Sequence, residues 1–297
     1  MKNKKLRVLI TGATGNVGSQ VFKSLTKIVT DRDISIDIII ADRNVEQARK
    51  ELHNYSNLEY TLFDFSDSST FEKSMTNIDI MFLLRPPQIS DIEKYFVPLF
   101  NSAKKVGLKN IIFLSVQGAD KSKVIPHNKI EKLIKQYEFD YIFVRPSYFM
   151  QNLTTTLLSE IRNNNSITLP SGNAKFNWVD VNDIGLCIAK LILSFEEYSN
   201  RPVVITGSEN LDYYTAAELL SKTIGREIKF KSVSPFRFYI LKTRQGLKSG
   251  FAFVMTLLHF LPRLQKEPEI TNNIKKITGK EPTKLIEFIE KEKNLFL

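Results

Sequence analysis

Cysteine and long apolar runs are scarce in this chain, and each scarcity excludes a class of protein. Cys187 is the only cysteine among 297 residues, so no intramolecular disulfide can form and a disulfide-stabilised secreted domain is excluded. The apolar stretch 251–261 is well short of the roughly 18 residues that a membrane span requires. No export signal is recognisable before the first apolar run. We therefore expect a cytoplasmic protein with no membrane partner.

The composition is that of a globular protein, with 42% hydrophobic and 25% charged residues. The formal net charge of +10 would suit a nucleic-acid partner, because excess lysine and arginine attract phosphates. However, the excess is scattered and increases toward the C-terminal third, without a helix-turn-helix pattern, a zinc-ligand spacing or an aromatic-interleaved basic motif. We therefore expect a solvated basic surface, no direct nucleic-acid partner and no metal site.

The start of the chain has the pattern of a strand, a glycine-rich turn and a helix. The apolar run 6–10 passes into Thr11-Gly12-Ala13-Thr14-Gly15-Asn16-Val17-Gly18. Glycines at this spacing allow a tight turn, close approach of a diphosphate and close packing of the helix on the sheet. The helix start would direct unpaired N–H groups and its positive dipole end at the phosphates. The pattern predicts dinucleotide binding, although an isolated glycine pattern also occurs in surface turns. The predicted cofactor contacts in the turn are Gly12, Thr14, Gly15, Asn16, Val17 and Gly18.

Further strand-like runs alternate with helical segments through the first half of the chain. Continuous apolar runs suit parallel strands that are covered on both faces, and the alternation suits right-handed βαβ crossovers. Residues 1–150 are therefore predicted to form an α/β domain with a doubly wound parallel sheet. The predicted strands after the first are 36–41, 58–63, 78–84, 110–115 and 140–145.

Residues 151–297 are predicted to form a smaller, mostly helical part that packs on the carboxyl edge of the sheet and closes a cleft there, where ligands bind in such folds. Segment 236–261 is rich in aromatic residues, which suits a substrate lid, a dimer face or a core helix. A homodimer is therefore one interpretation. The predicted helices are 154–164, 181–194, 215–224, 236–261 and 282–293, and the predicted short strands are 203–206 and 228–231.

The end of the second predicted strand is where a dinucleotide fold selects its cofactor. The Asp42 carboxylate would accept hydrogen bonds from the ribose hydroxyls and repel a 2′-phosphate, whereas the Arg43 guanidinium would pair with that phosphate. We expect NADP, with NAD as the alternative, and Asp42 would otherwise cap the next helix. After the third strand, Asp64 and Phe65 would contact the adenine, or else form a helix-capping loop.

Taken together, these motifs resemble the NmrA-like group of atypical short-chain dehydrogenases. The resemblance covers nearly the whole chain and depends on the glycine-rich turn, Arg43-Asn44 and segments 82–87, 113–119, 126–131, 144–152 and 178–184. It implies a Rossmann-like domain, a small C-terminal domain and a bound nicotinamide dinucleotide. The group includes NADPH-dependent quinone reductases, dye reductases and redox-sensing regulators, so the resemblance implies no particular substrate.

The resemblance also shows that this chain lacks a pair of catalytic residues. Classical short-chain dehydrogenases carry Tyr-x-x-x-Lys, but none of the ten tyrosines here is followed by lysine four residues later. Ser115 resembles the catalytic serine position, and His127 resembles the lysine position. His127 would hold the nicotinamide ribose or donate a proton, since its unperturbed pKa is about 6.5; a helix-start histidine facing solvent is the alternative. Tyr148 is the remaining candidate for a phenolic proton donor.

Residues near these positions complete the predicted site. Leu84 and Arg85 follow the fourth strand and are expected beside the nicotinamide. Tyr148, Phe149 and Asn152 are expected to face a flat, apolar substrate. We therefore predict an NAD(P)H-dependent reductase that transfers hydride to a quinone, dye or enone, because an easily reduced acceptor tolerates the missing tyrosine pair. The alternative is a non-catalytic NAD(P) redox sensor; a nucleotide-sugar epimerase would need the tyrosine pair.

Overall fold

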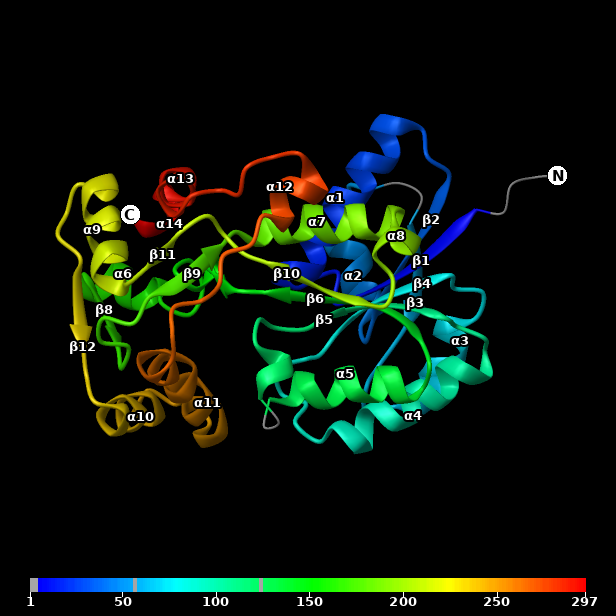
Figure 1. Ribbon diagram of the computed structural model, residues 1–297, viewed down its shortest axis with the longest axis horizontal. Coiled ribbons are helices and arrows are strands. Elements are labelled where there is room, and N and C mark those ends of the chain that lie inside the picture. The colour runs from blue at the N-terminus through cyan, green and yellow to red at the C-terminus, as the bar shows by residue number, and fades with distance from the viewer. Residues whose placement is uncertain (1–4, 56–57, 123–124) are drawn as a thin grey trace. The chain divides into compact units, whose positions relative to one another are not determined.

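The computed structural model describes residues 5–55, 58–122 and 125–297 (Figure 1). The chain folds into two compact units. The first contains the chain up to Pro146 together with Val181–Ile205 and Asn273–Gly279, and the second contains Ser147–Asp180, Thr206–Asn272 and Lys280–Leu297. The expected boundary at residue 150 therefore does not separate the two units, because two later segments return to the first unit and pack on its sheet and helices.

A seven-stranded parallel sheet forms the centre of the first unit, in the order β10-β6-β5-β4-β1-β2-β3. This order confirms the predicted doubly wound, Rossmann-like fold. Strand β10, expected in the second part, instead pairs in parallel with β6 and extends the sheet. The strands are β1 (Leu6–Thr11), β2 (Ile36–Asp42), β3 (Leu58–Leu62), β4 (Ile80–Leu84), β5 (Asn110–Leu114), β6 (Asp140–Pro146) and β10 (Arg201–Ile205).

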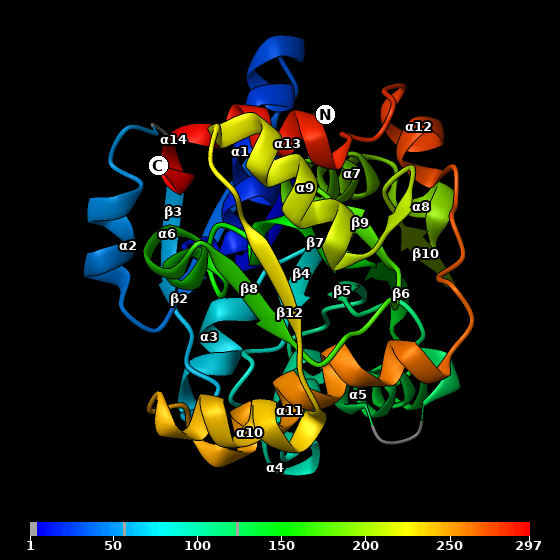
Figure 2. The ribbon, with the colours of Figure 1, turned by 90° about the vertical axis from the view of Figure 1, so that its left-hand side faces the viewer.

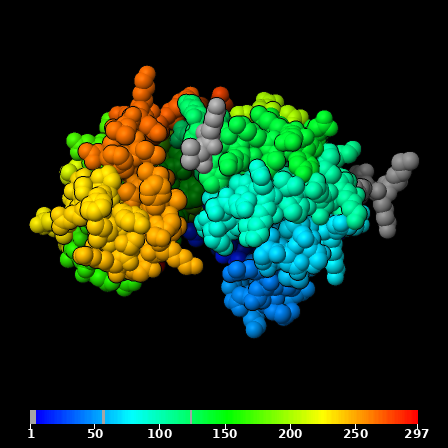
Figure 3. All heavy atoms as spheres, turned by 90° about the horizontal axis from the view of Figure 1, so that it is seen from below, coloured from blue at the N-terminus to red at the C-terminus, as the bar shows by residue number. Residues whose placement is uncertain are grey.

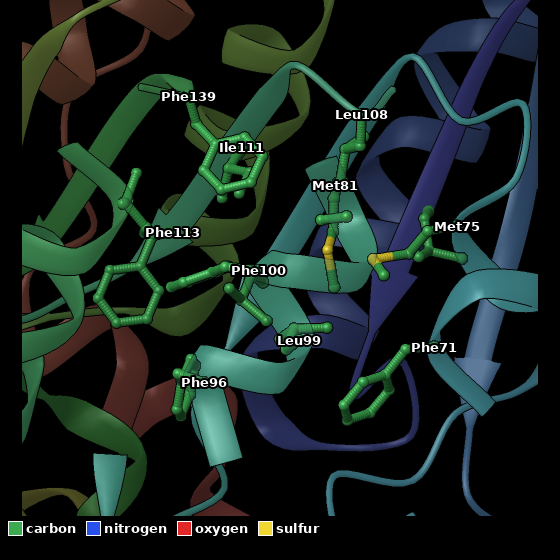
Figure 4. Packing of buried hydrophobic residues seen from close by; sticks show 14 of the residues in the cluster. Phe71, Met75, Met81, Phe96, Leu99, Phe100, Leu108, Ile111, Phe113 and Phe139 are labelled. Carbon is green, nitrogen blue, oxygen red and sulfur yellow. The ribbon is translucent and has the colours of Figure 1, made fainter. Parts of the chain in front are cut away.

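Helices cover both faces of this sheet, which explains why most of its strands are largely apolar runs (Figure 1). Helices α1 (Asn16–Arg32), α7 (Val181–Leu193) and α12 (Asn273–Thr278) pack together on one face, and α3 (Phe71–Met75), α4 (Ile92–Lys105) and α5 (Pro126–Gln136) on the other. Figure 4 shows buried side chains between the sheet and the second group, among them Met81, Phe100 and Phe113. The unit also contains α2 (Val45–Glu51), α8 (Phe195–Tyr198) and the 3-10 turns Ser68–Thr70 and Ala119–Lys121.

The second unit combines helices with two small sheets. Strands β7 (Tyr148–Phe149), β9 (Phe176–Val179) and β11 (Asn210–Leu211) form one sheet, and β8 (Ser166–Leu169) pairs in parallel with β12 (Lys229–Ser232) in the other (Figure 2). Its core includes the fully buried Trp178, Tyr213 and Phe238. The helices are α6 (Leu158–Asn164), α9 (Tyr213–Ile224), α10 (Pro235–Arg244), α11 (Ser249–Phe260), α13 (Leu285–Lys291) and α14 (Lys293–Phe296), with 3-10 turns at Met150–Asn152 and Leu261–Leu264.

One predicted helix, 236–261, is two helices in the structure. Gly246 adopts a φ of +88°, and its N–H donates to Thr243 O at 3.0 Å while Leu247 N donates to Lys242 O at 3.1 Å. This is a Schellman ending, which needs a left-handed residue and therefore favours glycine. Helix α10 ends there and α11 begins at Ser249. No helix within the described ranges is long and apolar enough to cross a membrane.

Candidate functional site

The predicted cofactor residues of the first unit follow the carboxyl ends of five neighbouring strands. Gly12 follows β1, Asp42 ends β2, Asp64 follows β3, Arg85 follows β4 and Ser115 follows β5. These strands are parallel and adjacent in the order β5-β4-β1-β2-β3. The fold therefore brings residues from across 100 positions of sequence to one edge of the sheet, which is where ligands bind in doubly wound folds.

Each glycine of the turn has a separate structural reason. Gly12 has a φ of +64°, a left-handed conformation, and an added Cβ would lie 2.7 Å from Leu84 Cδ2. At Gly18, an added Cβ would lie 2.0 Å from Gly12 O, so the helix can pack on the turn only without a side chain. At Gly15, an added Cβ would meet only Gly12 O, at 3.3 Å, so the space beside Gly15 is otherwise open.

The start of α1 suits an anion. Its N-cap is Gly15, which has no side chain to accept hydrogen bonds from the first-turn amides, and that turn contains no acidic residue. Gly15 N donates to Gly12 O at 2.9 Å and closes the turn. Exposed amides and the positive end of the helix dipole are the groups that bind phosphate. The turn therefore fits the diphosphate of a dinucleotide, with open space at the residue where the backbone must be approached.

The end of β2 is joined to this turn by Asp42. Thr14 Oγ1 donates to Asp42 Oδ2 at 3.1 Å, and Asn44 N donates to Asp42 Oδ1 at 2.9 Å. The side chain that caps α2 is that of Asn44, whose Oδ1 accepts from Gln47 N at 3.0 Å. Asp42 is therefore not the helix cap. The neighbouring Arg43 side chain is exposed.

Asp64 is a charged acceptor in a tight turn after β3. Hydrogen bonds from the Ser66 hydroxyl and amide, at 2.7 and 2.8 Å, lower the pKa of Asp64, and the positive charge of Arg43 adds to this. Phe65 packs edge-on against Phe63, with ring centroids 5.1 Å apart, and is a partly buried member of the core. Contact of Asp64 and Phe65 with adenine stays a prediction.

One nitrogen of the Arg85 guanidinium donates hydrogen bonds to the backbone of its own loop. Its Nη1 donates to the carbonyls of Pro86 and Pro87, each at 3.1 Å, and of Ile89 at 2.5 Å. Burial lowers the pKa of Arg85. The adjacent Leu84 side chain packs beside Gly12. Arg85 therefore stabilises the conformation of the loop after β4.

Ser115 belongs to a buried ion-pair network that sequence reasoning missed. Its hydroxyl donates to Glu131 Oε1 at 2.6 Å, and Arg145 binds the same carboxylate through Nε at 2.9 Å and Nη2 at 2.6 Å. Arg145 Nη1 lies 3.2 Å from Asp120. The signal in the sequence was Arg145 itself, a cation that follows the apolar run 142–144 near the end of β6. The Ser115 proton is directed at Glu131, and its catalytic role stays a prediction.

His127 is uncharged at neutral pH, and its expected role as a proton donor there stays a prediction that this charge state does not favour. Burial, with the nearby charge of Arg85, lowers the pKa of His127 to about 3. The ring lies against Phe113, with centroids 5.9 Å apart, and so does not face solvent freely as the alternative supposed. Its Nδ1 is buried and has no hydrogen-bond partner among the described residues. This nitrogen suits a ligand hydroxyl, so ribose binding stays a prediction.

Tyr148, in the second unit, is held in a directed chain of hydrogen bonds. His259 Nδ1 lies 2.8 Å from Met255 O, and since a carbonyl only accepts, Nδ1 carries the proton. His259 Nε2 then accepts from the Tyr148 hydroxyl at 2.8 Å, and Tyr148 accepts from Tyr213 at 2.6 Å. Burial raises the pKa of Tyr148 and lowers that of His259 to about 4, which keeps both neutral.

Sequence reasoning did not find Tyr213 and His259, because they lie 65 and 111 positions after Tyr148. Asn152 also hydrogen-bonds to the Tyr148 hydroxyl, and Phe149 is half-buried in β7. The Tyr148 proton therefore points to His259 within its own unit. The predicted roles of Tyr148, Phe149 and Asn152 toward a substrate stay predictions.

An open cavity of about 560 Å³ lies elsewhere in the second unit, and the predicted site residues do not line it. Tyr214 and Arg263 line it, as does Lys175, whose ammonium lies 2.9 Å from a Glu267 carboxylate oxygen. Among the described residues, no group of three or more His, Cys, Asp or Glu side chains could hold a metal ion.

Known proteins share both the sequence pattern and the fold. The pattern of the NmrA-like family matches residues 4–291. The chain belongs to the NmrA-like family. Prestalk A differentiation protein A of Dictyostelium discoideum is 29% identical over 284 residues, which cover 96% of this chain and 91% of that protein.

Two solved structures of reductases have the same fold as this NmrA-like chain. The Citrobacter sp. triphenylmethane reductase, solved with NADP(H), superposes with a TM-score of 0.81 at 20% identity and covers 96% of this chain and 99% of its own. The NADPH-dependent quinone oxidoreductase of Escherichia coli, solved with NADPH, gives 0.83 at 21% identity and covers 98% and 100%. At these identities the likeness shows the fold alone.

Proposed function

We propose that this NmrA-like protein is an NAD(P)H-dependent reductase of a small, flat acceptor such as a quinone, a dye or an enone. The observation that carries the proposal is the glycine-rich turn, where an uncapped helix start and open space beside Gly15 match a dinucleotide diphosphate. The proposal is also supported by the two solved structures of the same fold, which are of reductases bound to NADP(H) or NADPH. A cytoplasmic location and a homodimer belong to the proposal.

NADP is the proposed cofactor, with NAD as the weaker alternative. Exposed Arg43 would pair with the 2′-phosphate, while Thr14 already donates a hydrogen bond to the Asp42 carboxylate and reduces its repulsion of that phosphate. The reduced nicotinamide supplies the hydride when bound. His127 would offer a neutral ring nitrogen to a ribose hydroxyl.

The acceptor class follows from the proton donors. His127 is neutral at pH 7, and the hydroxyls of Ser115 and Tyr148 already donate within the protein. A carbonyl that needs a protein acid is therefore a poor candidate, whereas a quinone or a cationic dye accepts hydride and takes any proton from water. We propose Tyr148, Phe149 and Asn152 as the contacts of this acceptor.

The same shortage of free proton donors favours the second candidate, a non-catalytic NAD(P) redox sensor. The experiment that separates the two is to mix the protein with NADPH and a panel of quinones and dyes, and to follow the nicotinamide absorbance. A reductase oxidises NADPH faster than buffer does, and Gly15→Val, which should not bind the cofactor, provides the control. Tight NADPH binding without oxidation by any acceptor would replace the reductase by the sensor.

A further inference from the structure

Helix α11 is apolar on all sides, yet only one side is covered. Ala252, Met255 and His259 are buried, and Met255 belongs to the core of the second unit. On the opposite side, large apolar side chains project into solvent at helical spacing. These are Phe251, Phe253, Val254 and Leu258, each at least half exposed. A helix that is hydrophobic all round is normally buried, yet the outward face of α11 has no partner among the residues that the structure describes.

The exposed apolar surface extends beyond α11. Phe236, at the start of α10, is 74% exposed, and Leu264, in the 3-10 turn after α11, is 71% exposed. Figure 3 shows α10 in yellow and α11 in orange at the surface of the second unit. We call these six side chains, together with the intervening Leu261, the apolar face. It is contained within one segment of chain, 235–266.

The charge of this segment is of one sign. Residues 235–266 contain six lysines and arginines and no aspartate or glutamate. Lys242 is buried, and the other five are exposed: Arg237, Arg244, Lys248, Arg263 and Lys266. Exposed aromatic and aliphatic side chains with flanking cations are the combination that binds anionic lipid surfaces, because apolar groups enter the interface and cations meet the headgroups.

A second copy of this chain fits the surface less well. An isologous dimer would place the five exposed cations of one copy opposite those of the other, which repel. An anionic surface has the complementary charge.

We propose that residues 235–266 dock the protein peripherally on an anionic membrane surface, with the apolar face in the headgroup region and the exposed cations over the anionic lipids. This docking needs no membrane-spanning helix, but it departs from the expectation of no membrane partner. It also does not depend on the proposed reductase activity.

The test measures co-sedimentation of the full chain with vesicles of phosphatidylcholine and phosphatidylglycerol in equal amounts, and with pure phosphatidylcholine. We expect binding to the mixed vesicles that weakens as salt is raised, and little binding to the neutral ones. Arg244→Gln and Lys248→Gln should each weaken binding by about fivefold, and by about 25-fold together. Phe251→Asp combined with Leu258→Asp should abolish it.

Matched controls carry the same changes outside the segment. Leu62→Asp replaces another half-exposed leucine, and Lys129→Gln replaces an exposed cation of α5; both should bind vesicles as the wild type does. Thermal unfolding checks that all variants fold. Absence of vesicle binding, equal binding to neutral vesicles, or a dimer in light scattering that Phe251→Asp dissociates without any vesicle binding would each overturn the proposal.

Discussion

Gly15 borders open space, whereas Gly18 is enclosed by backbone, and this difference makes Gly15 the sharper probe of ligand binding. A Cβ at Gly15 would meet only Gly12 O, at 3.3 Å, and the residue has a φ of −88°, which any side chain can adopt. We expect Gly15→Val to fold and to lose dinucleotide binding in calorimetry, because the side chain occupies the path of the diphosphate. Gly250→Ala, in open space, is the control. Wild-type affinity in Gly15→Val would contradict the phosphate role of the turn.

Arg43 decides the proposed preference for NADP. Removing a charge-assisted hydrogen bond costs about 1 to 3 kcal/mol, so Arg43→Ala should weaken NADPH binding by that amount and spare NADH. Titration of both cofactors measures the difference. Arg49→Ala, an exposed cation of α2, should leave both affinities unchanged. Equal losses for NADPH and NADH in Arg43→Ala would show that the guanidinium does not read the 2′-phosphate.

His259 makes stability depend on pH. Its folded-state pKa is about 4, below the 6.5 of an unfolded histidine, so the unfolded chain takes up a proton first as the pH falls. The free energy of unfolding should therefore be highest above pH 6.5 and decrease by about 3 kcal/mol toward pH 4 from this group, at about 1.4 kcal/mol per pKa unit. Urea unfolding at several pH values measures it. His259→Gln should show a shallower decrease than the wild type.

His127 acts in the same direction, since its folded-state pKa is about 3, and it keeps part of the acid sensitivity in the His259 variant. Identical slopes for His259→Gln and the wild type would show that His259 is not held neutral by its surroundings.

At the level of elements, the Glu131–Arg145 pair joins α5 to β6 and reaches the end of β5 through Ser115. Removing one partner of a buried pair leaves the other charge uncompensated. Glu131→Gln should therefore lower the free energy of unfolding by about 3 kcal/mol or more in urea titrations, whereas Glu93→Gln, exposed on α4, should have little effect. A loss below that of an ordinary surface substitution would mean that the network contributes nothing to the junction.

Elements with a strong local signal could be predicted from sequence. Most of the six strands of the first half are apolar runs because helices cover both faces of the sheet, and each strand lies where the sequence predicts it. Strands β7 and β11 contain two residues each and depend on pairing with β9, which no local pattern reveals. The break in segment 236–261 was visible as Gly246, but a glycine within an apolar run can also stay helical.

At the level of the whole molecule, the sequence could predict which strand ends form the site, but not the hydrogen-bond partners of its side chains. The glycine-rich turn and the strand ends follow from chain order. That Ser115 donates to Glu131, or that Tyr148 donates to His259, depends on contacts between residues 16 and 111 positions apart. Likewise, the pKa of His127 depends on burial, which its sequence neighbours do not determine. Sequence position alone therefore places Ser115, His127 and Tyr148 near the site but does not say where their protons point.

The most direct test of the account is a calorimetric titration of the purified protein with NADPH and, separately, with NADH. We expect saturable binding at one site, with NADPH the tighter ligand, because the turn accepts the diphosphate and Arg43 the 2′-phosphate. Absence of binding by either nucleotide would contradict the dinucleotide site and the reductase that depends on it.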